Sequence, residues 1–243
     1  MARTALVTGA NRGIGLEFVR QLLARGDHVV AACRNPGKAA ALNSLAGEHP
    51  GRLHVLPLDV ADAKSRARLA HELPLVLGER EDGTPGTLDL LVNNAGVLHS
   101  GERFGHVEQA MLEDSLRINA IGPFLLAQAL APLLRDAASS RTVIANISSQ
   151  LGSIANTTRF GTPSYDISKA AQNMGSVLLA RALAERGIVV LALHPGWVQT
   201  EMGGSQAQVA AADAVAGLLR VIDAATPAQS GTFVDWRGEP LPW

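Results

Sequence analysis

The sequence predicts an α/β protein built on a doubly wound, seven-stranded parallel sheet with helices on both faces. Short apolar runs alternate along the chain with longer helical stretches, which indicates right-handed crossover connections. The short runs are apolar almost throughout rather than at every second residue, as expected for strands covered on both faces. The predicted strands are Thr4–Thr8, His28–Cys33, Leu53–Leu58, Leu88–Val92, Thr142–Ile147, Ile188–Leu193 and Gly231–Val234.

Helices are predicted from the spacing of apolar residues. In the first of them Ile14, Phe18 and Leu22 recur every four residues and share one face. The predicted helices that flank the motifs discussed below are Gly13–Arg25, Met111–Asp136 and Tyr165–Arg186. The predicted loops are Glu79–Thr87, Leu151–Pro163 and Glu201–Gln208. None of these loops has the length or composition of an interdomain linker, so we expect residues 1–243 to form a single domain.

Composition excludes several classes of protein. The chain is 47% apolar and 18% charged, with a formal net charge of −1, so it can bury a large core and offers no basic patch for nucleic acid. Its single cysteine, Cys33, excludes an intrachain disulfide. The seven histidines show no metal-ligand spacing, and we expect no metal site.

The chain is also expected to be a cytoplasmic protein without a membrane partner. Charges or glycines interrupt the apolar runs before the roughly 18 residues that a membrane span needs. The first predicted strand begins at Thr4, which leaves no room for a signal peptide.

The unusual residues fall at the carboxyl ends of six predicted strands. In open α/β sheets, ligands bind in the crevice at these ends. The segments, in strand order, are Thr8–Gly15, Arg34, Asp59-Val60, Asn93–Gly96, Ser148-Ser149 and His194–Trp197. Because they come from distant parts of the chain and meet at one edge, together they predict a ligand site there.

The loop after the first strand carries Gly9, Gly13 and Gly15 in the pattern G-x-x-x-G-x-G. Glycines allow a tight turn and let the backbone approach a pyrophosphate, and the helix that follows attracts the anion to its N-terminus. The loop therefore predicts a Rossmann-type dinucleotide site; the alternative is an ordinary strand-to-helix turn.

Two arginines favour NADPH over NADH as the cofactor. A site that prefers NADH usually has an acidic residue after the second strand, which bonds to the ribose 2′-hydroxyl. Here that position reads Cys33-Arg34-Asn35. Arg34, together with Arg12 of the glycine loop, can hold a 2′-phosphate through paired hydrogen bonds. The alternative is that both are ordinary surface arginines.

Five motifs occur in a fixed order along essentially the whole chain. They are Thr8-Gly9-x-x-x-Gly13-Ile14-Gly15, Asn93-Asn94-Ala95-Gly96, Ser149, Tyr165-x-x-x-Lys169 and Pro195-Gly196. In these motifs the chain resembles the short-chain dehydrogenases/reductases. Residues 147–154, 193–203 and 241–243 are most similar to the C-factor and Sniffer-type carbonyl reductases. One departure is Asp166, where a basic residue is expected, and it weakens any inference about the substrate.

The resemblance implies an NAD(P)-dependent oxidoreductase that reduces an aldehyde, ketone or quinone. Tyr165 is the only tyrosine, and Lys169, four residues on, shares its face if the segment is helical. An adjacent ammonium lowers the pKa of a phenol from its usual value near 10, and the phenol then serves as proton donor to the carbonyl oxygen. The alternative for this pair is a solvated helix face.

The resemblance assigns roles to the residues around this pair. Lys169 also bonds to the nicotinamide ribose, and Ser149 holds the substrate oxygen, with Ser148 as the alternative. Asn119 helps to position a water for proton relay behind the lysine, or else caps a helix. His194 is expected to be a core or supporting residue rather than a catalyst.

The remaining cofactor contacts are assigned by position. Asp59 and Val60 are expected at the adenine, and Asn93 is expected at the adenosine ribose unless it is a simple turn residue. The full set expected to contact the cofactor is Gly9, Asn11, Arg12, Gly13, Ile14, Gly15, Arg34, Asp59, Val60, Asn93, Ala95, Gly96, Tyr165, Lys169, Pro195, Gly196, Val198 and Thr200. The segment Glu201–Val209 is short and polar, and we expect it to be a mobile flap over the substrate.

A homodimer or higher homo-oligomer is also expected. The helix Met111–Asp136 presents a broad apolar surface that, in the resembled family, often packs with the helix near Tyr165 against a second subunit; the alternative is complete burial within one chain. That surface comprises Ile121, Phe124, Leu125, Leu130 and Leu133. Two alternative functions stay open: a cofactor-binding sensor or C-factor-like signalling protein with incidental turnover, and an alcohol dehydrogenase that works oxidatively.

Overall fold

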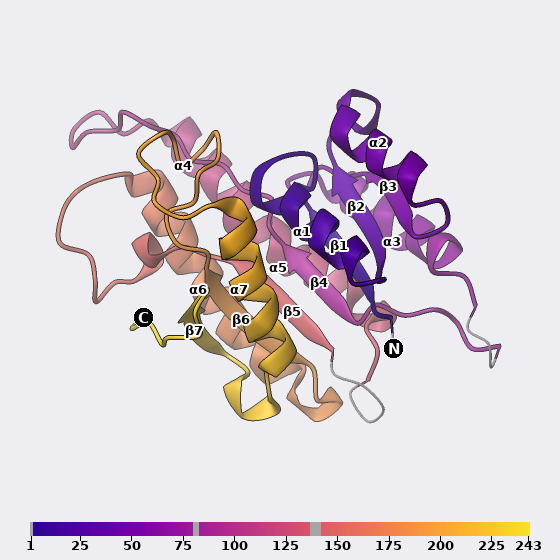
Figure 1. Cartoon of the computed structure of the whole chain (residues 1–243). Coiled ribbons are helices and arrows are strands. Elements are labelled where there is room, and N and C mark those ends of the chain that lie inside the picture. The colour runs from indigo at the N-terminus through magenta and orange to yellow at the C-terminus, as the bar shows by residue number, and fades with distance from the viewer. Residues whose placement is uncertain (1, 80–82, 137–141) are drawn as a thin grey trace.

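The computed structural model describes residues 2–79, 83–136 and 142–243 (Figure 1), so part of the predicted loop at 79–87 lies outside the described residues. Within these ranges, seven parallel strands form one sheet in the order β3-β2-β1-β4-β5-β6-β7. The strands are β1 (Thr4–Thr8), β2 (His28–Cys33), β3 (Leu53–Pro57), β4 (Leu90–Asn93), β5 (Val143–Ile147), β6 (Val189–His194) and β7 (Thr232–Asp235). The predicted fold class is confirmed.

The strand order reverses between β1 and β4, and this reversal positions the candidate site. The chain runs outward from β1 through β2 to β3, and then crosses back to start the other half at β4. In such sheets the crevice for a ligand lies at the carboxyl ends of the two strands where the direction changes. Here those two strand ends carry the glycine loop after β1 and the segment that begins at Asn93.

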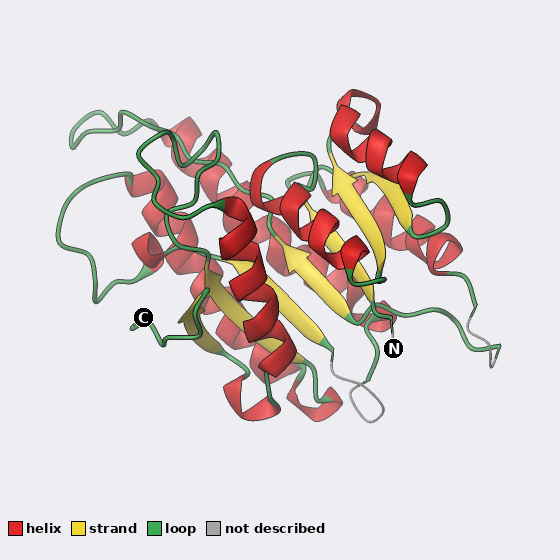
Figure 2. Cartoon of the chain, viewed as in Figure 1, coloured by secondary structure: helices red, strands yellow, loops and turns green. Residues whose placement is uncertain are grey.

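Helices cover both faces of the sheet (Figure 2). They are α1 (Gly13–Ala24), α2 (Ala40–Glu48), α3 (Ala63–Leu77), α4 (Gln109–Leu116), α5 (Gly122–Leu130), α6 (Pro163–Ala182) and α7 (Ala211–Ala224). One core lies under α1, α2 and α7, where Phe18 and Leu219 pack against Val7 of β1. The other lies under α3, α5 and α6, where Leu69 and Leu126 pack against Leu6. Successive residues of β1 thus point into different cores, which explains why its run is apolar throughout.

The long helix predicted at 111–136 is divided in the structure. It consists of α4, a π-helical segment (Arg117–Ile121), α5 and a 3-10 turn (Ala131–Leu133). Gly122, at the start of α5, lies so close to the segment after β3 that a Cβ there would be 2.7 Å from the carbonyl oxygen of Val60. Apolar residues continue on both sides of this division, so their spacing alone does not reveal it.

The run Gln109–Leu133 is 25 residues long and contains an 18-residue window with a mean hydropathy of 1.3, so by length and composition it could cross a membrane. As expected from the sequence, charged residues and a glycine, among them Arg117 and Gly122, interrupt this run. The same property is shared by core helices of soluble proteins, and in this fold the run packs against α6, with Leu126 and Leu130 fully buried.

Candidate active site

The glycine loop is held in a conformation that requires glycine. Gly9 and Gly13 have φ angles of 62° and 54°, in the left-handed region. A Cβ on Gly15 would lie 2.3 Å from the carbonyl oxygen of Gly9, which is far inside van der Waals contact. The loop therefore turns as tightly as the sequence pattern predicts.

Two polar residues fix this loop against the end of β4. The Thr8 hydroxyl oxygen accepts hydrogen bonds from the backbone N–H groups of Asn94 and Ala95, both at 3.0 Å. The Asn94 amide donates to the carbonyl oxygens of Thr8 and Gly9 at 3.0 and 3.2 Å. Asn94 lies within the motif Asn93-Asn94-Ala95-Gly96, but its contact with Thr8 and Gly9 is not evident from the sequence.

The N-terminus of α1 has the features of an anion site. The helix starts at Gly13, directly after the loop, and Arg12 at the cap position makes no side-chain hydrogen bond to the helix. Within the described helix, the first turn carries no acidic residue. Its backbone N–H groups and the positive end of its dipole are thus available to a phosphate, and the glycine backbone leaves room for close approach. These residues fit a dinucleotide pyrophosphate.

The segment after β6 lies against the glycine loop. A Cβ on Gly13 would be 3.3 Å from the Thr200 methyl group. Arg12 forms an ion pair with Glu201, a partner that is 189 positions away and was not anticipated from sequence. Of the neighbouring predicted residues, Gly196 has a φ of 85° and Val198 is buried.

The segment Glu201–Val209, which is expected from the sequence to be a mobile flap, is hydrogen-bonded at its end to the residues that precede it. The backbone N–H groups of Gln208 and Val209 both donate to the carbonyl oxygen of Trp197 at 3.0 Å, and Gln199 donates to that of Val209 at 2.8 Å. The Trp197 indole donates to the carbonyl oxygen of Gly203 at 2.8 Å. The segment is therefore a compact loop in this structure.

The two arginines proposed for a 2′-phosphate differ in their surroundings. Arg34 is exposed just after β2, and none of the described residues forms an ion pair with it. Arg12 is also exposed but is paired with Glu201. Only Arg34 is free to meet an anion without first losing a partner.

At the end of β3, the predicted adenine contacts are held by local bonds. One Asp59 carboxylate oxygen accepts from the backbone N–H of Ala61 at 2.9 Å. Val60 is buried, and its carbonyl oxygen accepts from the Arg66 guanidinium at 2.6 Å. Because Cys33 pairs in register with Pro57, Asp59 and Arg34 follow neighbouring strand ends.

The predicted residues at the end of β4 divide into two groups. Asn93 is the last residue of the strand and is 2% exposed; its amide donates to Asn146 of β5 at 2.8 Å, so it is not a simple turn residue. Gly96 faces the catalytic candidates: a Cβ there would be 3.3 Å from Asn119 Oδ1 and 3.9 Å from Lys169 Nζ.

Tyr165 and Lys169 lie on the buried face of α6. They are 8% and 4% exposed, so the alternative of a solvated helix face is wrong. The helix approaches the turn after β5 so closely that a Cβ on Gly152 would be 2.7 Å from the Lys169 carbonyl carbon. Lys169 Nζ lies 5.6 Å from the centre of the Tyr165 ring and donates to the carbonyl oxygen of Ile147 at 2.8 Å.

Of the two serines after β5, Ser149 is the one that meets the tyrosine. Its hydroxyl oxygen accepts from the backbone N–H of Leu151 at 3.2 Å, and its hydrogen bond to Tyr165 lowers the pKa of the phenol. Ser148 instead donates to Asn173 at 2.6 Å and is buried. The hydroxyl proton of Ser148 is therefore already committed.

Burial sets the pKa values of the pair. It raises the pKa of Tyr165 to about 12, an effect that the nearby Asp166 carboxylate reinforces and that the Ser149 bond only partly offsets. Burial also lowers the pKa of Lys169 to about 7. The expectation that Lys169 lowers the phenol pKa is thus not met in the protein alone, because the lysine is itself desolvated and only partly charged at neutral pH.

Asn119 is fully buried in the π-helical segment rather than at a helix end, so it is not a helix cap. Its amide accepts from the Val97 backbone N–H and donates to the Val97 carbonyl oxygen, both at 2.8 Å, and donates to the Ser168 hydroxyl at 2.9 Å. Its side chain thus anchors the segment after Gly96 to α6. Irregular π-helical turns are frequent at functional sites.

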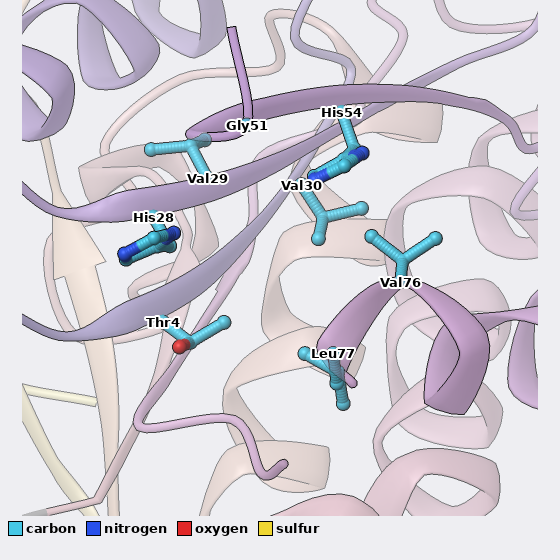
Figure 3. A pocket seen from close by; sticks show the side chains of 8 residues that line it. All are labelled: Thr4, His28, Val29, Val30, Gly51, His54, Val76 and Leu77. Carbon is cyan, nitrogen blue, oxygen red and sulfur yellow. The ribbon is translucent and has the colours of Figure 1, made fainter. Parts of the chain in front are cut away.

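A small cavity of about 60 Å³ lies at the opposite, amino ends of β1, β2 and β3. Figure 3 shows His28 and His54 among its lining residues, with Val76 and Leu77 of α3 closing one side. It is too small for a dinucleotide and lies away from the glycine loop, so it is not part of the candidate site.

The fold and this arrangement match a known family. A sequence profile of the short chain dehydrogenases matches residues 3–210. The chain belongs to the short-chain dehydrogenase/reductase family. It is 43% identical to the C-signal protein of Myxococcus xanthus over 158 residues, which are 65% of this chain and 94% of that protein.

Two solved structures of carbonyl reductases are similar over the full length. The NADPH-bound enzyme from chicken fatty liver has a TM-score of 0.91 at 38% identity, covering 100% of this chain and 99% of that one. Sniffer of D. melanogaster has a TM-score of 0.93 at 33% identity, covering 100% of both chains. The resemblance to the C-factor and Sniffer-type members is therefore confirmed, and the chain is an oxidoreductase of this family.

Proposed function

We propose that this chain is an NADPH-dependent carbonyl reductase that converts an aldehyde, ketone or quinone to an alcohol. We further propose that residues 1–243 act as a single Rossmann-type domain, and that the protein works in the cytoplasm. The observation that carries the activity is the contact of Ser149 with Tyr165, with Lys169 Nζ 5.6 Å from the phenol ring, beside a glycine loop that fits a pyrophosphate.

In this mechanism Ser149 and Tyr165 bind the carbonyl oxygen, and Tyr165 donates its proton to that oxygen. A bound nicotinamide cofactor supplies the hydride for the carbonyl carbon. With a pKa of about 12, the phenol is fully protonated at neutral pH, and this is the state that reduction requires. Lys169 holds the ribose of the cofactor and stabilises the phenolate left after the proton transfer.

The remaining predicted residues shape the cofactor site in this proposal. Gly9, Asn11, Gly13, Ile14 and Gly15 place backbone around the pyrophosphate, and Arg34 meets the 2′-phosphate. Asp59 and Val60 border the adenine, and Asn93, Ala95 and Gly96 border the adenosine ribose. Pro195, Gly196, Val198 and Thr200 border the nicotinamide and the phosphates. Asn119 supports the proton relay indirectly, by holding α6 and the segment after Gly96 together.

The proposal is tested by following NADPH and NADH oxidation with aromatic and aliphatic aldehydes, ketones and quinones. We expect turnover with NADPH, and a kcat/KM for at least one compound in the ordinary enzyme range of about 10⁴ M⁻¹s⁻¹ or more. Binding of NADPH without turnover of any compound in the set would contradict the reductase.

The second candidate function is a cofactor-binding sensor or signalling protein, favoured by the identity to the C-signal protein. In that case Ser149, Tyr165 and Lys169 contribute to binding only. Substitutions at Tyr165 distinguish the two functions. They should leave the signalling response of a sensor intact, but they should abolish the carbonyl reduction of a reductase.

We also propose that the chain forms a homodimer, and that the helix that carries Tyr165, rather than the helix at 111–136, supplies most of the expected surface. Of the predicted apolar residues on the helix at 111–136, Leu130 is fully buried and Ile121 is half exposed. On α6, three apolar side chains are exposed: Ile167, Met174 and Leu178 are 49%, 61% and 53% exposed. These residues recur along one helix face, and a second copy of the same face would cover them.

Replacing Met174 by glutamate is expected to dissociate this dimer. In an isologous interface each subunit contributes the same residue, so two carboxylates would be buried next to each other in apolar surroundings. We therefore expect the dimer affinity to fall at least about 100-fold. Sedimentation velocity at micromolar concentration measures the change. Leu75→Glu, on α3 and 81% exposed, is the matched control and should leave the dimer intact. A wild-type protein that sediments only as a monomer contradicts the proposed dimer.

A further inference from the structure

A glutamine lies directly beneath the candidate catalytic lysine. Gln172, one turn further along α6, is 3% exposed, and its Oε1 accepts a hydrogen bond from Lys169 Nζ at 2.9 Å. A second proton of Nζ goes to the carbonyl oxygen of Ile147. Since an ammonium has three protons, one is left to meet a cofactor or substrate group on the side of Gly96.

The other end of this glutamine indicates that it is not there for stability. Its Nε2 is buried and has no hydrogen-bond partner among the described residues. A buried, unpaired amide nitrogen destabilises the fold, so an apolar side chain of similar size would suit the packing better. The lysine contact is the one polar interaction of this side chain that the described structure shows, and it is therefore the reason to infer a role in the site.

The backbone beneath Gln172 is also fixed. Its carbonyl oxygen accepts from the Ser176 hydroxyl at 2.9 Å, and that hydroxyl accepts from the Asn146 amide at 2.8 Å. Asn146 in turn accepts from Asn93 at 2.8 Å. This buried chain of bonds ties the middle of α6 to β5 and β4, and it holds residue 172 at a defined height below Lys169.

Charges on the neighbouring elements do not replace the glutamine. The elements packed against α6 carry Glu113 and Asp114 on α4, Arg117 in the π-helical segment, Glu185 and Arg186 in the 3-10 turn that follows α6, and His194 on β6. Asp114 already accepts from His99 at 3.1 Å, and burial alone accounts for the lowered pKa of Lys169. On α6 itself Tyr165 faces the lysine as a neutral phenol.

We propose that Gln172 is a positioning residue, whose Oε1 holds Lys169 Nζ in place and favours its charged form during carbonyl reduction. This inference rests on the proposed function. A carbonyl oxygen accepts a stronger hydrogen bond from an ammonium than from a neutral amine, so its loss shifts the lysine towards the neutral form. The neutral form neither stabilises a phenolate nor holds the ribose as firmly.

The charge of Lys169 can be titrated directly, because lysine occurs only at positions 38, 64 and 169. Protein labelled with ¹³C at lysine Cε gives three signals, and the signals of Lys38 and Lys64 serve as internal controls. In the wild type we expect the Lys169 signal to titrate near pH 7. In Gln172→Leu its midpoint should fall by about one pH unit, since a hydrogen bond to a charged group is lost. In Gln172→Glu, which adds a negative charge at the same place, it should rise.

The second readout is the pH dependence of NADPH affinity and of kcat/KM. At pH 8, NADPH affinity of Gln172→Leu should be up to about tenfold weaker than that of the wild type, while at pH 5.5 the two should be similar. Gln172→Glu should shift the alkaline limb of both pH profiles to higher pH. Thermal unfolding of the same samples shows that each variant is folded.

Opposite shifts of the Lys169 midpoint, with matching shifts of the pH profiles, support the proposal. An unchanged midpoint in both variants, or a shift in the same direction, overturns it, because a packing role moves stability and not the lysine charge. If Gln172→Leu does not fold, Gln172→Met, which also lacks the amide oxygen, takes its place. If the wild type turns over no compound, the proposed reductase fails, and the lysine titration with the NADPH-affinity profile still decides the role of Gln172.

Discussion

Tyr165→Phe is expected to lower carbonyl reduction by about 10³-fold while leaving NADPH affinity within about twofold of the wild type. The substitution removes one oxygen and keeps the ring, which is 8% exposed and packs on the buried face of α6. Loss of that oxygen removes the proton donor and the group to which Ser149 is bonded. Binding of the cofactor, in contrast, depends on the glycine loop and on Lys169.

Single-turnover reduction under saturating NADPH measures the chemical step, and quenching or enhancement of cofactor fluorescence measures affinity. Ser148→Ala is the matched control, because Ser148 bonds to Asn173 and not to the tyrosine. It should retain turnover within a few-fold. If Tyr165→Phe keeps more than a tenth of the wild-type rate, the proton comes from another group and the assigned role of Tyr165 is wrong.

The protonation state of Tyr165 in the protein without cofactor favours reduction over oxidation. A phenol with a pKa of about 12 carries its proton throughout the physiological range, so it can donate without prior activation. Oxidation of an alcohol needs the phenolate instead, and burial opposes that form. A positive charge near the ring is required to stabilise it, and Lys169, with a pKa near 7, supplies only part of one at neutral pH.

Local patterns were sufficient to predict the frame of this site. Each predicted strand overlaps an observed one, because buried parallel strands are apolar throughout and their ends carry glycine or polar residues. The i, i+4 spacing of Tyr165 and Lys169 placed both on one face of α6 without further information. Their burial, however, depends on how closely Gly152 lets the helix approach the end of β5. Because burial sets the pKa values of both groups, these values could not be predicted from the spacing alone.

What sequence could not provide are contacts between residues far apart in the chain. Asn94 reaches back to Thr8, and Glu201 reaches Arg12 across 189 positions. Neither carries a spacing signal that identifies its partner. Gln172 is close to Lys169 in sequence, but on an amphipathic helix an isolated glutamine is usually solvated, and only its 3% exposure reveals the contact.

Arg34→Ala is expected to lower the preference for NADPH over NADH by about 10- to 100-fold, mainly through NADPH. Arg34 is exposed at the end of β2 and has no ion-pair partner among the described residues, so its guanidinium is available to a 2′-phosphate. A hydrogen-bonded arginine–phosphate contact contributes about 1.5–3 kcal/mol, which corresponds to this range. The ratio of kcat/KM values for the two cofactors measures the effect, and Arg68→Ala, on the exposed side of α3, controls for net charge.

Arg12→Ala should have a smaller effect than Arg34→Ala, because Arg12 must first leave Glu201 before it meets a phosphate. The side chains of that pair are 62% and 77% exposed, so solvent screens the attraction and breaking it costs less than about 1 kcal/mol. Glu201→Gln frees Arg12 and is therefore expected to tighten NADPH binding by up to about fivefold, with little change for NADH. Equal effects of Glu201→Gln on both cofactors would show that the pair acts on the loop after β6 and not on the 2′-phosphate. An unchanged cofactor ratio in both arginine variants would remove the basis for predicting NADPH from these residues.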